Sequence, residues 1–267
     1  MDINLGIICF LTFVIHLIGT LAYSVRIAGV RTRRIAVSFA LFNILVLVSR
    51  TSNSFQGPFL ANRVEKNLLH PAWHSLIADF RWLLFSATVA TIVGAFLIPT
   101  FQRIFSKAVL EFQVHRSIPR LLLHICFRGG LAQVKDSVSL PASSNVMALR
   151  DGQSISTGTI ALNVVAVSLW TVGVFAALYA GYLNPQLRAT SSALSGIVNG
   201  VATMLMFVVI DPQLSVMTDD VIEGRQSESS FRRAIVWLVG SRLAGTLLAQ
   251  LLLVPAASLI VFVAERL

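Results

Sequence analysis

Two arginines, Arg81 and Arg242, stand inside long apolar stretches of the sequence, and Arg50 closely follows a third stretch. An arginine near the middle of a membrane costs about 2.5 to 3.5 kcal/mol even on insertion scales, so each needs a partner or water. Asp79 is the one acid within these stretches, which leaves an excess of cations. Because a guanidinium group binds phosphate and carboxylate with paired hydrogen bonds, we predict that Arg50, Arg81 and Arg242 bind an anionic substrate.

Arg242 also has a structural interpretation. Asp79 is the acid available to neutralise it in a buried ion pair, and in that case no anionic substrate is needed. Arg26, at the end of the first apolar stretch, is explained equally well as a residue that sets membrane orientation.

Uncharged polar residues recur at helical spacing within the apolar stretches, so each set lies on one helix face that meets protein or water. We predict that Asn43, Asn199 and Gln250 also contact the substrate. Packing is the alternative for many of these residues, because Ser, Thr and Asn hydrogen-bond between membrane helices, and Gly196 with Gly200 forms a G-x-x-x-G pattern that permits close approach. The sets are Thr12, His16, Thr20 and Tyr23; Asn43 and Arg50; Ser192, Ser195, Asn199 and Thr203; and Arg242, Thr246 and Gln250.

Two titratable residues within these stretches, His16 and Asp79, are candidates for coupling a proton to transport. A histidine can change charge near neutral pH, and an intramembrane carboxylate can accept a proton. A buried histidine with a purely structural role is the alternative.

Motifs of nucleotide-driven and hydrolytic enzymes are absent from the sequence. It contains no phosphate-binding G-x-x-x-x-G-K-[ST] loop, no H-E-x-x-H and no Cys/His cluster, so we expect no enzyme, metal or cofactor. Cys9 and Cys126 are expected to be packing residues. A lipid phosphatase would have only His70, His74 and Arg63 as loosely grouped candidates.

The elements that would position these residues are apolar helices. Of the 267 residues, 55% are hydrophobic and 12% are charged, which predicts an all-α polytopic membrane protein with a single transmembrane domain over residues 1–267. Asn184 and Pro185 predict a tight turn, and Pro255 a kink. The six predicted spans cover 3–25, 35–53, 76–97, 159–183, 189–210 and 234–263.

Residues 100–157 are predicted to form a basic cytoplasmic loop with interfacial helices inside it. Phe101, Phe105 and Phe112 recur at helical spacing, and the short apolar block 121–127 lies between arginines. An amphipathic basic helix of this kind lies at the head-group level and attracts anionic lipid. A cytoplasmic cap packed on the helix bundle is an equally good interpretation.

Basic residues also indicate the orientation of the spans. Fourteen Lys and Arg residues fall on the side that carries the first, third and fifth loops, against five on the other side. The positive-inside rule therefore predicts that both termini are outside. The net charge of +9 is explained by these flanking residues, so membrane lipids are expected partners and nucleic acid is not. No internal repeat is recognisable, although three spans in each half would make the halves inverted.

Three long segments resemble the Amj family, the alternate lipid II flippases of bacteria. They are residues 128–150, residues 183–220 and residues 17–65, the last of which reads LIGTLAYSVRIAGVRTRRIAVSFALFNILVLVSRTSNSFQGPFLANRVE. The resemblance implies a protein of the bacterial cytoplasmic membrane that moves lipid-linked peptidoglycan precursor, lipid II, from the inner to the outer leaflet. The three arginines would then hold phosphate or carboxylate, and Asn43, Asn199 and Gln250 would meet sugar or peptide.

Two alternatives remain open from the sequence. The first is a transporter of another anionic polyprenyl-linked lipid, such as undecaprenyl phosphate or a teichoic acid precursor. The second is a membrane scaffold for cell-wall enzymes, in which the polar faces are dry helix contacts and Asp79 neutralises Arg242. Protein partners are not indicated.

Overall fold

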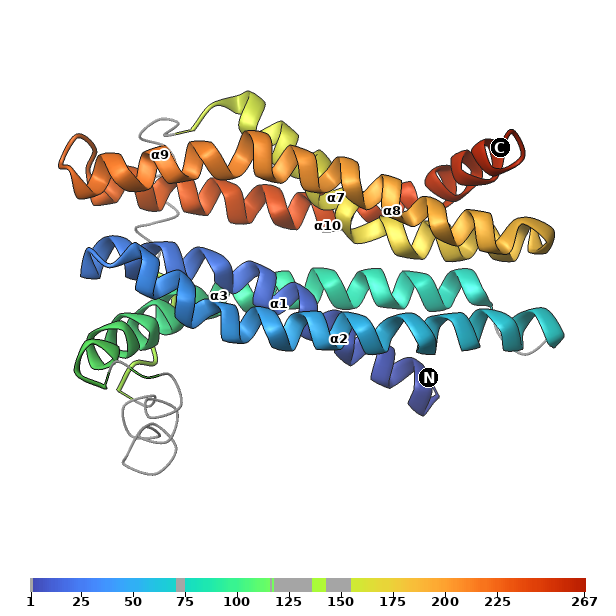
Figure 1. Ribbon diagram of the computed structural model, residues 1–267, viewed down its shortest axis with the longest axis horizontal. Coiled ribbons are helices and arrows are strands. Elements are labelled where there is room, and N and C mark those ends of the chain that lie inside the picture. The colour runs from blue at the N-terminus through green and yellow to red at the C-terminus, as the bar shows by residue number, and fades with distance from the viewer. Residues whose placement is uncertain (1, 71–74, 116, 118–135, 143–154) are drawn as a thin grey trace.

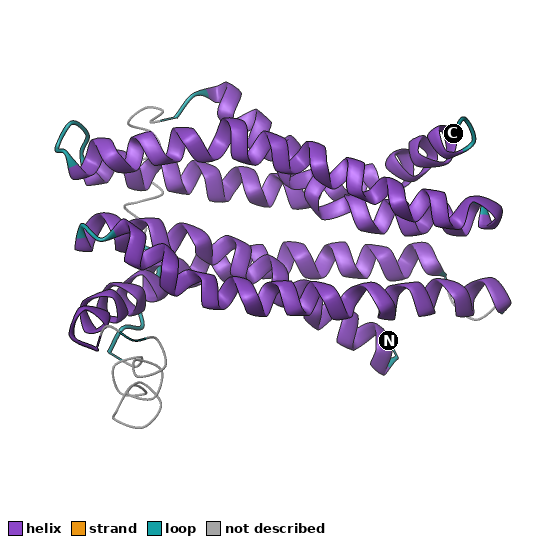
Figure 2. Cartoon of the chain, viewed as in Figure 1, coloured by secondary structure: helices purple, strands orange, loops and turns teal. Residues whose placement is uncertain are grey.

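The computed structural model describes residues 2–70, 75–115, 117, 136–142 and 155–267, and within these ranges it contains helices, turns and no strands (Figure 2). Six helical segments are long and apolar enough to cross a membrane, which confirms the predicted all-α polytopic class. The elements are α1 (Ile3–Thr32), α2 (Ile35–Leu69), α3 (Leu76–His115), α7 (Thr157–Leu183), the short 3₁₀ helix η2 (Pro185–Leu187), α8 (Arg188–Met204), the π-helix η3 (Leu205–Ile210), α9 (Asp211–Ile222) and α10 (Glu228–Ala264).

Most spans are longer than predicted, and α2 shows why. Its polar middle was expected to end the helix near Asn53, but the helix continues to Leu69. The hydroxyls of Thr51, Ser52 and Ser54 donate to carbonyls four residues earlier in the same helix, at 2.9, 2.9 and 3.0 Å. These polar side chains are therefore satisfied within the helix and do not interrupt it.

The helix ends follow from local side-chain chemistry. Asp2, Ser156 and Ser227 cap the starts of α1, α7 and α10, each accepting a hydrogen bond from a backbone N–H three residues later. Arg33 ends α1 in the left-handed conformation with φ of 53°, so α2 begins only two residues later. The predicted turn at Asn184 and Pro185 is confirmed, since η2 joins α7 to α8 there.

The six apolar helical segments form two layers (Figure 1). In one layer α1 packs most extensively on α3 and then on α2, and in the other layer α7 packs most extensively on α10 and then on α8. The contacts between layers are chiefly those of α3 with α10. The two halves of the chain therefore have the same internal packing, with α1, α2 and α3 matching α7, the α8–η3–α9 span and α10.

The halves are inverted relative to each other. In Figure 1 the ends of α3 and α10 that follow Pro99 and Pro255 turn away at opposite ends of the molecule, as a twofold axis along the view requires. Pro58 in α2 and Pro212 in α9 also stand at equivalent places of their spans. Proline has no N–H to donate, and the π-helix η3 accommodates the interruption just before Pro212.

The first described part of the predicted cytoplasmic loop, residues 100–115, is the continuation of α3 beyond Pro99. Phe105 and Val109 are buried with Phe42 of α2, and the Phe42 and Phe105 rings meet edge to face at 6.3 Å. Residues 100–112 thus pack on the bundle as a cap would. The apolar block 121–127 and Cys126 lie outside the described residues.

The packing alternative, in which Gly196 and Gly200 permit close approach between helices, is wrong. A Cβ atom added at either position would meet nothing within 4 Å, so these glycines do not bring α8 close to another described helix. Close approach occurs instead at Gly94 of α3 against Thr20, and at Gly245 of α10 against Val167.

Candidate functional site

Polar side chains follow one side of α2. Helical periodicity aligns positions separated by 4, 7 and 11 residues, and Glu65 lies 11 residues beyond Ser54. Asn43, Arg50, Ser54 and Glu65 are all exposed. We call this set, with Phe39 at its start, the α2 line: Phe39, Asn43, Arg50, Ser54 and Glu65.

A second polar line lies on α8, and its first residue, Arg188, meets the α2 line. Arg188 pairs with Glu65 of α2 at 3.6 Å, which fixes the side of α8 that points toward α2. Ser192, Ser195, Asn199 and Thr203 follow Arg188 at helical spacing and are half-buried. The Asn199 carboxamide lies against Gly173 of α7, and its Oδ1 has no hydrogen-bond partner among the described residues. We call this set the α8 line: Arg188, Ser192, Ser195, Asn199 and Thr203.

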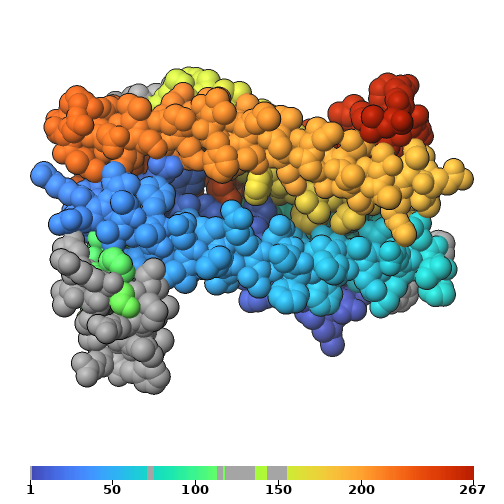
Figure 3. All heavy atoms as spheres, in the orientation of Figure 1, coloured from blue at the N-terminus to red at the C-terminus, as the bar shows by residue number. Residues whose placement is uncertain are grey.

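A furrow separates these helices. In Figure 3 it runs between α2 and the α8–η3–α9 span, and atoms of other helices form its floor. In the described part of the chain, α2 packs chiefly on α1 and much less on α3 and α7, and its contact with α8 is sparse apart from the Arg188–Glu65 pair. The α2 and α8 lines therefore border a groove that opens on the face seen in Figure 3.

Arg50 stands near the middle of α2, on the α2 line. At about 1.5 Å per residue, it stands roughly 17 Å along α2 from Phe39 and roughly 23 Å from Glu65, in a hydrocarbon core about 30 Å thick. Its side chain is exposed, and its guanidinium group makes no hydrogen bond or ion pair with any described residue. Only water or an anion can then satisfy this charge.

Ion pairs between the halves lie at both ends of the furrow. At the end that carries the basic turns, the basic end, Arg26 of α1 binds Asp211 of α9 at 2.8 Å and lies 5.2 Å from the centre of the Phe39 ring. At the end that carries both termini, the terminal end, Arg188 and Glu65 meet at the longer distance of 3.6 Å. The furrow is thus held more tightly at its basic end.

Arg242 is buried at the seam between the layers. It stands about 21 Å along α10 from the start of that helix, inside its long apolar stretch. Its guanidinium group packs on α1 at Gly19, where any Cβ would collide with Nη2, and it faces the Tyr23 hydroxyl. No described carboxylate lies within ion-pair distance, and Nε has no hydrogen-bond partner among the described residues.

Asn163 of α7 extends this polar seam. Its Nδ2 donates to Ser241 Oγ at 2.7 Å and to the Leu238 carbonyl at 3.2 Å, both on α10. The Tyr23 hydroxyl also lies beside Asn163. The buried network therefore joins α1, α7 and α10 around Arg242, and it includes Ser241, which spacing alone did not single out.

Asp79 does not neutralise Arg242. Its Oδ2 accepts a hydrogen bond from Arg63 Nε at 2.6 Å, and Asp2 binds Arg63 Nη1 at 2.8 Å. Both members of the Arg63–Asp79 pair are buried at the terminal end. The structural alternative, in which Asp79 neutralises Arg242, is therefore wrong, and Arg63 is the residue whose structural role was missed.

His16 lies in the buried face of α1. Thr12, Thr20 and Tyr23 are buried with it, and the Thr12 and Thr20 hydroxyls donate to carbonyls of their own helix. This face is largely a packing face. His16 Nδ1 is the exception, since it is buried without a hydrogen-bond partner among the described residues.

Arg81 and Gln250 meet near the terminal end, away from Arg50. Gln250 Nε2 donates to the Arg81 carbonyl at 3.1 Å, and both line a shallow pocket with Trp82 and Phe85 between α3 and α10. The structure thus places Asn43, Arg50 and Asn199 around the furrow, Arg242 and His16 in the buried seam, and Arg81 with Gln250 outside both. Within the described ranges, no three His, Cys, Asp or Glu side chains are grouped as a metal site requires.

Two inverted three-helix halves that border a polar groove at membrane depth are the architecture of a membrane transporter. The model of the family described as "Alternate to MurJ", Amj, matches residues 11–264, so the chain belongs to the Amj family. It is 38% identical over 265 residues to the Lipid II flippase Amj of Bacillus subtilis (strain 168), covering 95% of this chain and 93% of that protein. No solved structure matches the chain.

Proposed function

We propose that this protein is a lipid II flippase, which moves lipid-linked peptidoglycan precursor from the inner to the outer leaflet of the bacterial cytoplasmic membrane. The observation that carries the proposal is Arg50, an exposed arginine at mid-membrane depth with no described partner, on the border of a groove between inverted halves. Membership of the Amj family and the similarity to a protein named Lipid II flippase Amj support the choice of substrate.

The furrow suits an amphiphile with a large anionic head. Lipid II carries a diphosphate, a disaccharide and a peptide with carboxylates, and its prenyl tail can stay in lipid while the head crosses about 30 Å of hydrocarbon. The groove is open on the face shown in Figure 3, so a head group can lie in it without the tail entering the protein. Arg50 then binds phosphate or carboxylate, and Asn43 and Asn199 bind sugar or peptide.

Arg242 and the pair Arg81–Gln250 act elsewhere on the path in this proposal. Arg242 supplies a fixed positive charge between the halves, held by Gly19 and Tyr23. Arg81 and Gln250 receive the head group near the terminal end. His16 is the candidate for proton coupling because its ring nitrogen is buried without a described partner, whereas the ion pair of Asp79 with Arg63 assigns Asp79 a structural role.

The two ends of the furrow open alternately. Inverted halves can exchange conformations, which closes one end while the other opens. The basic end faces the cytoplasm by the positive-inside rule, and both termini are outside. Closure of the basic end by Arg26 and Asp211 then corresponds to a conformation from which the precursor leaves outward.

A leaflet-exposure assay tests the proposal. The purified protein is reconstituted into liposomes with fluorescent lipid II, and a membrane-impermeant quencher reports the fraction exposed outside. We expect protein-dependent exchange between leaflets, inhibited by unlabelled lipid II. Protein-free liposomes and liposomes with an unrelated six-span protein are the controls. Unchanged leaflet exposure would reject flippase activity, and equal transport of undecaprenyl phosphate would reject selectivity for lipid II.

A further inference from the structure

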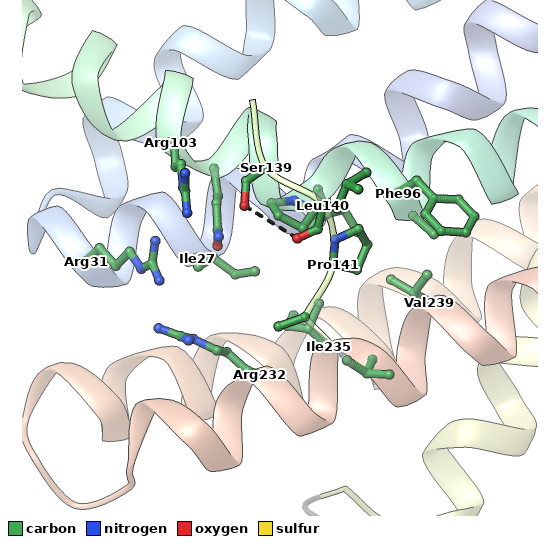
Figure 4. Close-up of a pocket in the computed structure, with 16 residues that line it drawn as sticks. Ile27, Arg31, Phe96, Arg103, Ser139, Leu140, Pro141, Arg232, Ile235 and Val239 are labelled. Atoms are coloured by element: carbon green, nitrogen blue, oxygen red, sulfur yellow. Dashed lines mark hydrogen bonds between the residues drawn. The ribbon is translucent and has the colours of Figure 1, made fainter. Parts of the chain in front are cut away.

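A second cationic site lies at the basic end, between α1, α3, α10 and the segment 139–142. It is a cavity of about 390 Å³. Figure 4 shows the side chains of Arg31, Arg103 and Arg232 gathered at one end of the cavity, and Phe96 and Val239 at the other. Positive charge and apolar surface are therefore separated along a single cavity.

Hydrogen bonds attach one wall of the cavity to α3. The Ser139 amide donates to Thr100 Oγ1 at 3.0 Å, and the Thr100 hydroxyl donates back to the Ser139 carbonyl at 3.0 Å. This reciprocal pair holds the segment 139–142 on α3 and makes it a wall of the cavity. Leu140 and Pro141 of that wall complete the apolar part with Ile235 of α10.

One carboxylate is shared by two of the three arginines. Glu228 Oε1 binds Arg31 Nε at 3.0 Å and Arg232 Nη2 at 2.5 Å. Arg103 has no hydrogen bond or ion pair with a described residue. Three positive charges thus face one negative charge, and the arginine group has room for a further anion.

We infer that this cavity binds the phosphate of a polyprenyl-linked lipid at the basic end, with Arg103, Arg31 and Arg232 on the phosphate and the first prenyl units against Phe96, Ile235 and Val239. A free anion would use only the arginine end, whereas an amphiphile uses both ends of the cavity. The identity of the lipid as the transported precursor rests on the proposed function. The binding of a lipid phosphate in the cavity does not depend on the proposed function.

Binding there affects the contact between the halves. The Arg31–Glu228 pair joins α1 of one half to α10 of the other. A phosphate bound by Arg31 and Arg232 competes with Glu228 for the same guanidinium groups, which weakens this contact at the basic end. Occupation of the cavity therefore favours opening of the end at which the lipid arrives.

A binding experiment tests this inference on the full chain in nanodiscs, with undecaprenyl phosphate as the probe. Arg103→Gln should weaken binding at least about tenfold, because it removes a guanidinium group from the phosphate. Arg225→Gln is the matched control and should leave the affinity unchanged, since Arg225 lies at the same end but pairs with Asp220 and Glu223 outside the cavity. Glu228→Gln should tighten binding by removing the competing carboxylate.

Further arms separate the possible outcomes. Neutral undecaprenol should bind weakly and be insensitive to Arg103→Gln. Inorganic phosphate that binds as tightly as the lipid would overturn the amphiphile site, as would equal affinity of Arg103→Gln and the unmodified protein. Weaker binding by Glu228→Gln would overturn the competition. If Arg103→Gln weakens lipid binding but liposomes show no exchange of lipid II, the proposed function is rejected and the lipid site in the cavity is supported. If exchange is normal and Arg103→Gln does not change the affinity, the lipid site is rejected and the proposed function is retained.

Discussion

Arg63 and Arg50 lie on the same helix, 13 residues apart, and have opposite surroundings. Arg63 is buried between Asp79 and Asp2, which join three helices through it. Arg50 is exposed at the furrow and has no described partner. An intramembrane arginine is therefore structural or functional according to the acids that the fold brings to it, and its residue type does not decide between the two.

The largest effect is expected for a variant that breaks the buried ion pair of Arg63, and it should be an effect on stability. Asp79→Asn removes the buried carboxylate 2.6 Å from Arg63 Nε and leaves Asp2 as the acid of the cluster. Breaking a buried pair from one side costs about 3 to 5 kcal/mol, so the free energy of unfolding should fall by roughly 3 kcal/mol. Denaturant unfolding in detergent micelles measures this. Asp2→Asn, which removes the more exposed partner, should cost less, and equal stability of Asp79→Asn would contradict a structural role.

Arg50→Gln should have the converse effect, on transport. Losing a hydrogen bond to a charged group costs about 1.5 to 3 kcal/mol, so lipid II exchange should slow by roughly tenfold to a hundredfold. The free energy of unfolding should change little, because Arg50 makes no described contact that folding requires. Leaflet exposure measured in liposomes reports the rate.

Two further variants control that result. Arg266→Gln removes an exposed arginine near the C-terminus and should leave the rate unchanged. Arg50→Lys keeps the charge but loses the planar fork, so it should recover only part of the rate. A normal rate with Arg50→Gln would remove this residue from the substrate path.

The distinction between Arg50 and Arg63 could be anticipated from the sequence only in part. Apolar stretches predicted six spans, and the spacing of Asn43 and Arg50 placed them on one helix face. Nothing local indicates that Glu65 meets Arg188, which lies 123 residues away and decides which side of α2 borders the furrow. The partners of Arg63 lie on other helices, so the sequence offered Asp79 as an alternative partner for Arg242 and did not indicate its pair with Arg63.

The inverted repeat was hidden for a different physical reason. Lipid-facing positions need only be apolar, so the halves can diverge while keeping the same packing. The residues that the halves still share are prolines, which alter the helix backbone: Pro58 matches Pro212, and Pro99 matches Pro255. Four prolines are too few for recognition without a known fold. The length of α2 was missed because its Ser and Thr side chains are satisfied internally.

A smaller effect on the exchange rate is expected for Gly19→Ala. This substitution displaces the Arg242 side chain without removing it. In Gly19→Ala the new methyl group collides with the Arg242 guanidinium, whose flexible end must shift. Overpacking of this kind costs about 1.4 kcal/mol, at the low end of the usual range, which corresponds to roughly tenfold slower exchange. Gly200→Ala is the control, because a Cβ there meets open space. Equal rates for both variants would show that Arg242 does not act from its present position.

The smallest effect is expected at the terminal end of the furrow. The Glu65–Arg188 pair is 3.6 Å long with both side chains about half exposed, so it contributes roughly 0.2 to 1 kcal/mol and is screened by salt. Glu65→Gln should therefore raise opening at this end by no more than about fivefold. Ala61 is half-buried and lies one helical turn before Glu65 on α2, so labelling of Ala61→Cys, after replacement of Cys9 and Cys126, measures that opening.

The same labelling compares the two ends directly. Asp211→Asn removes the tighter Arg26 pair, in which the arginine side chain is 12% exposed, and should open the basic end without faster labelling at position 61. High salt should reduce the difference in labelling rate between Glu65→Gln and the unmodified protein, because salt weakens the exposed Glu65–Arg188 pair in the unmodified protein. If Asp211→Asn instead accelerates labelling at position 61, the ends are not opposed, and a rocking motion of inverted halves is the wrong description of this furrow.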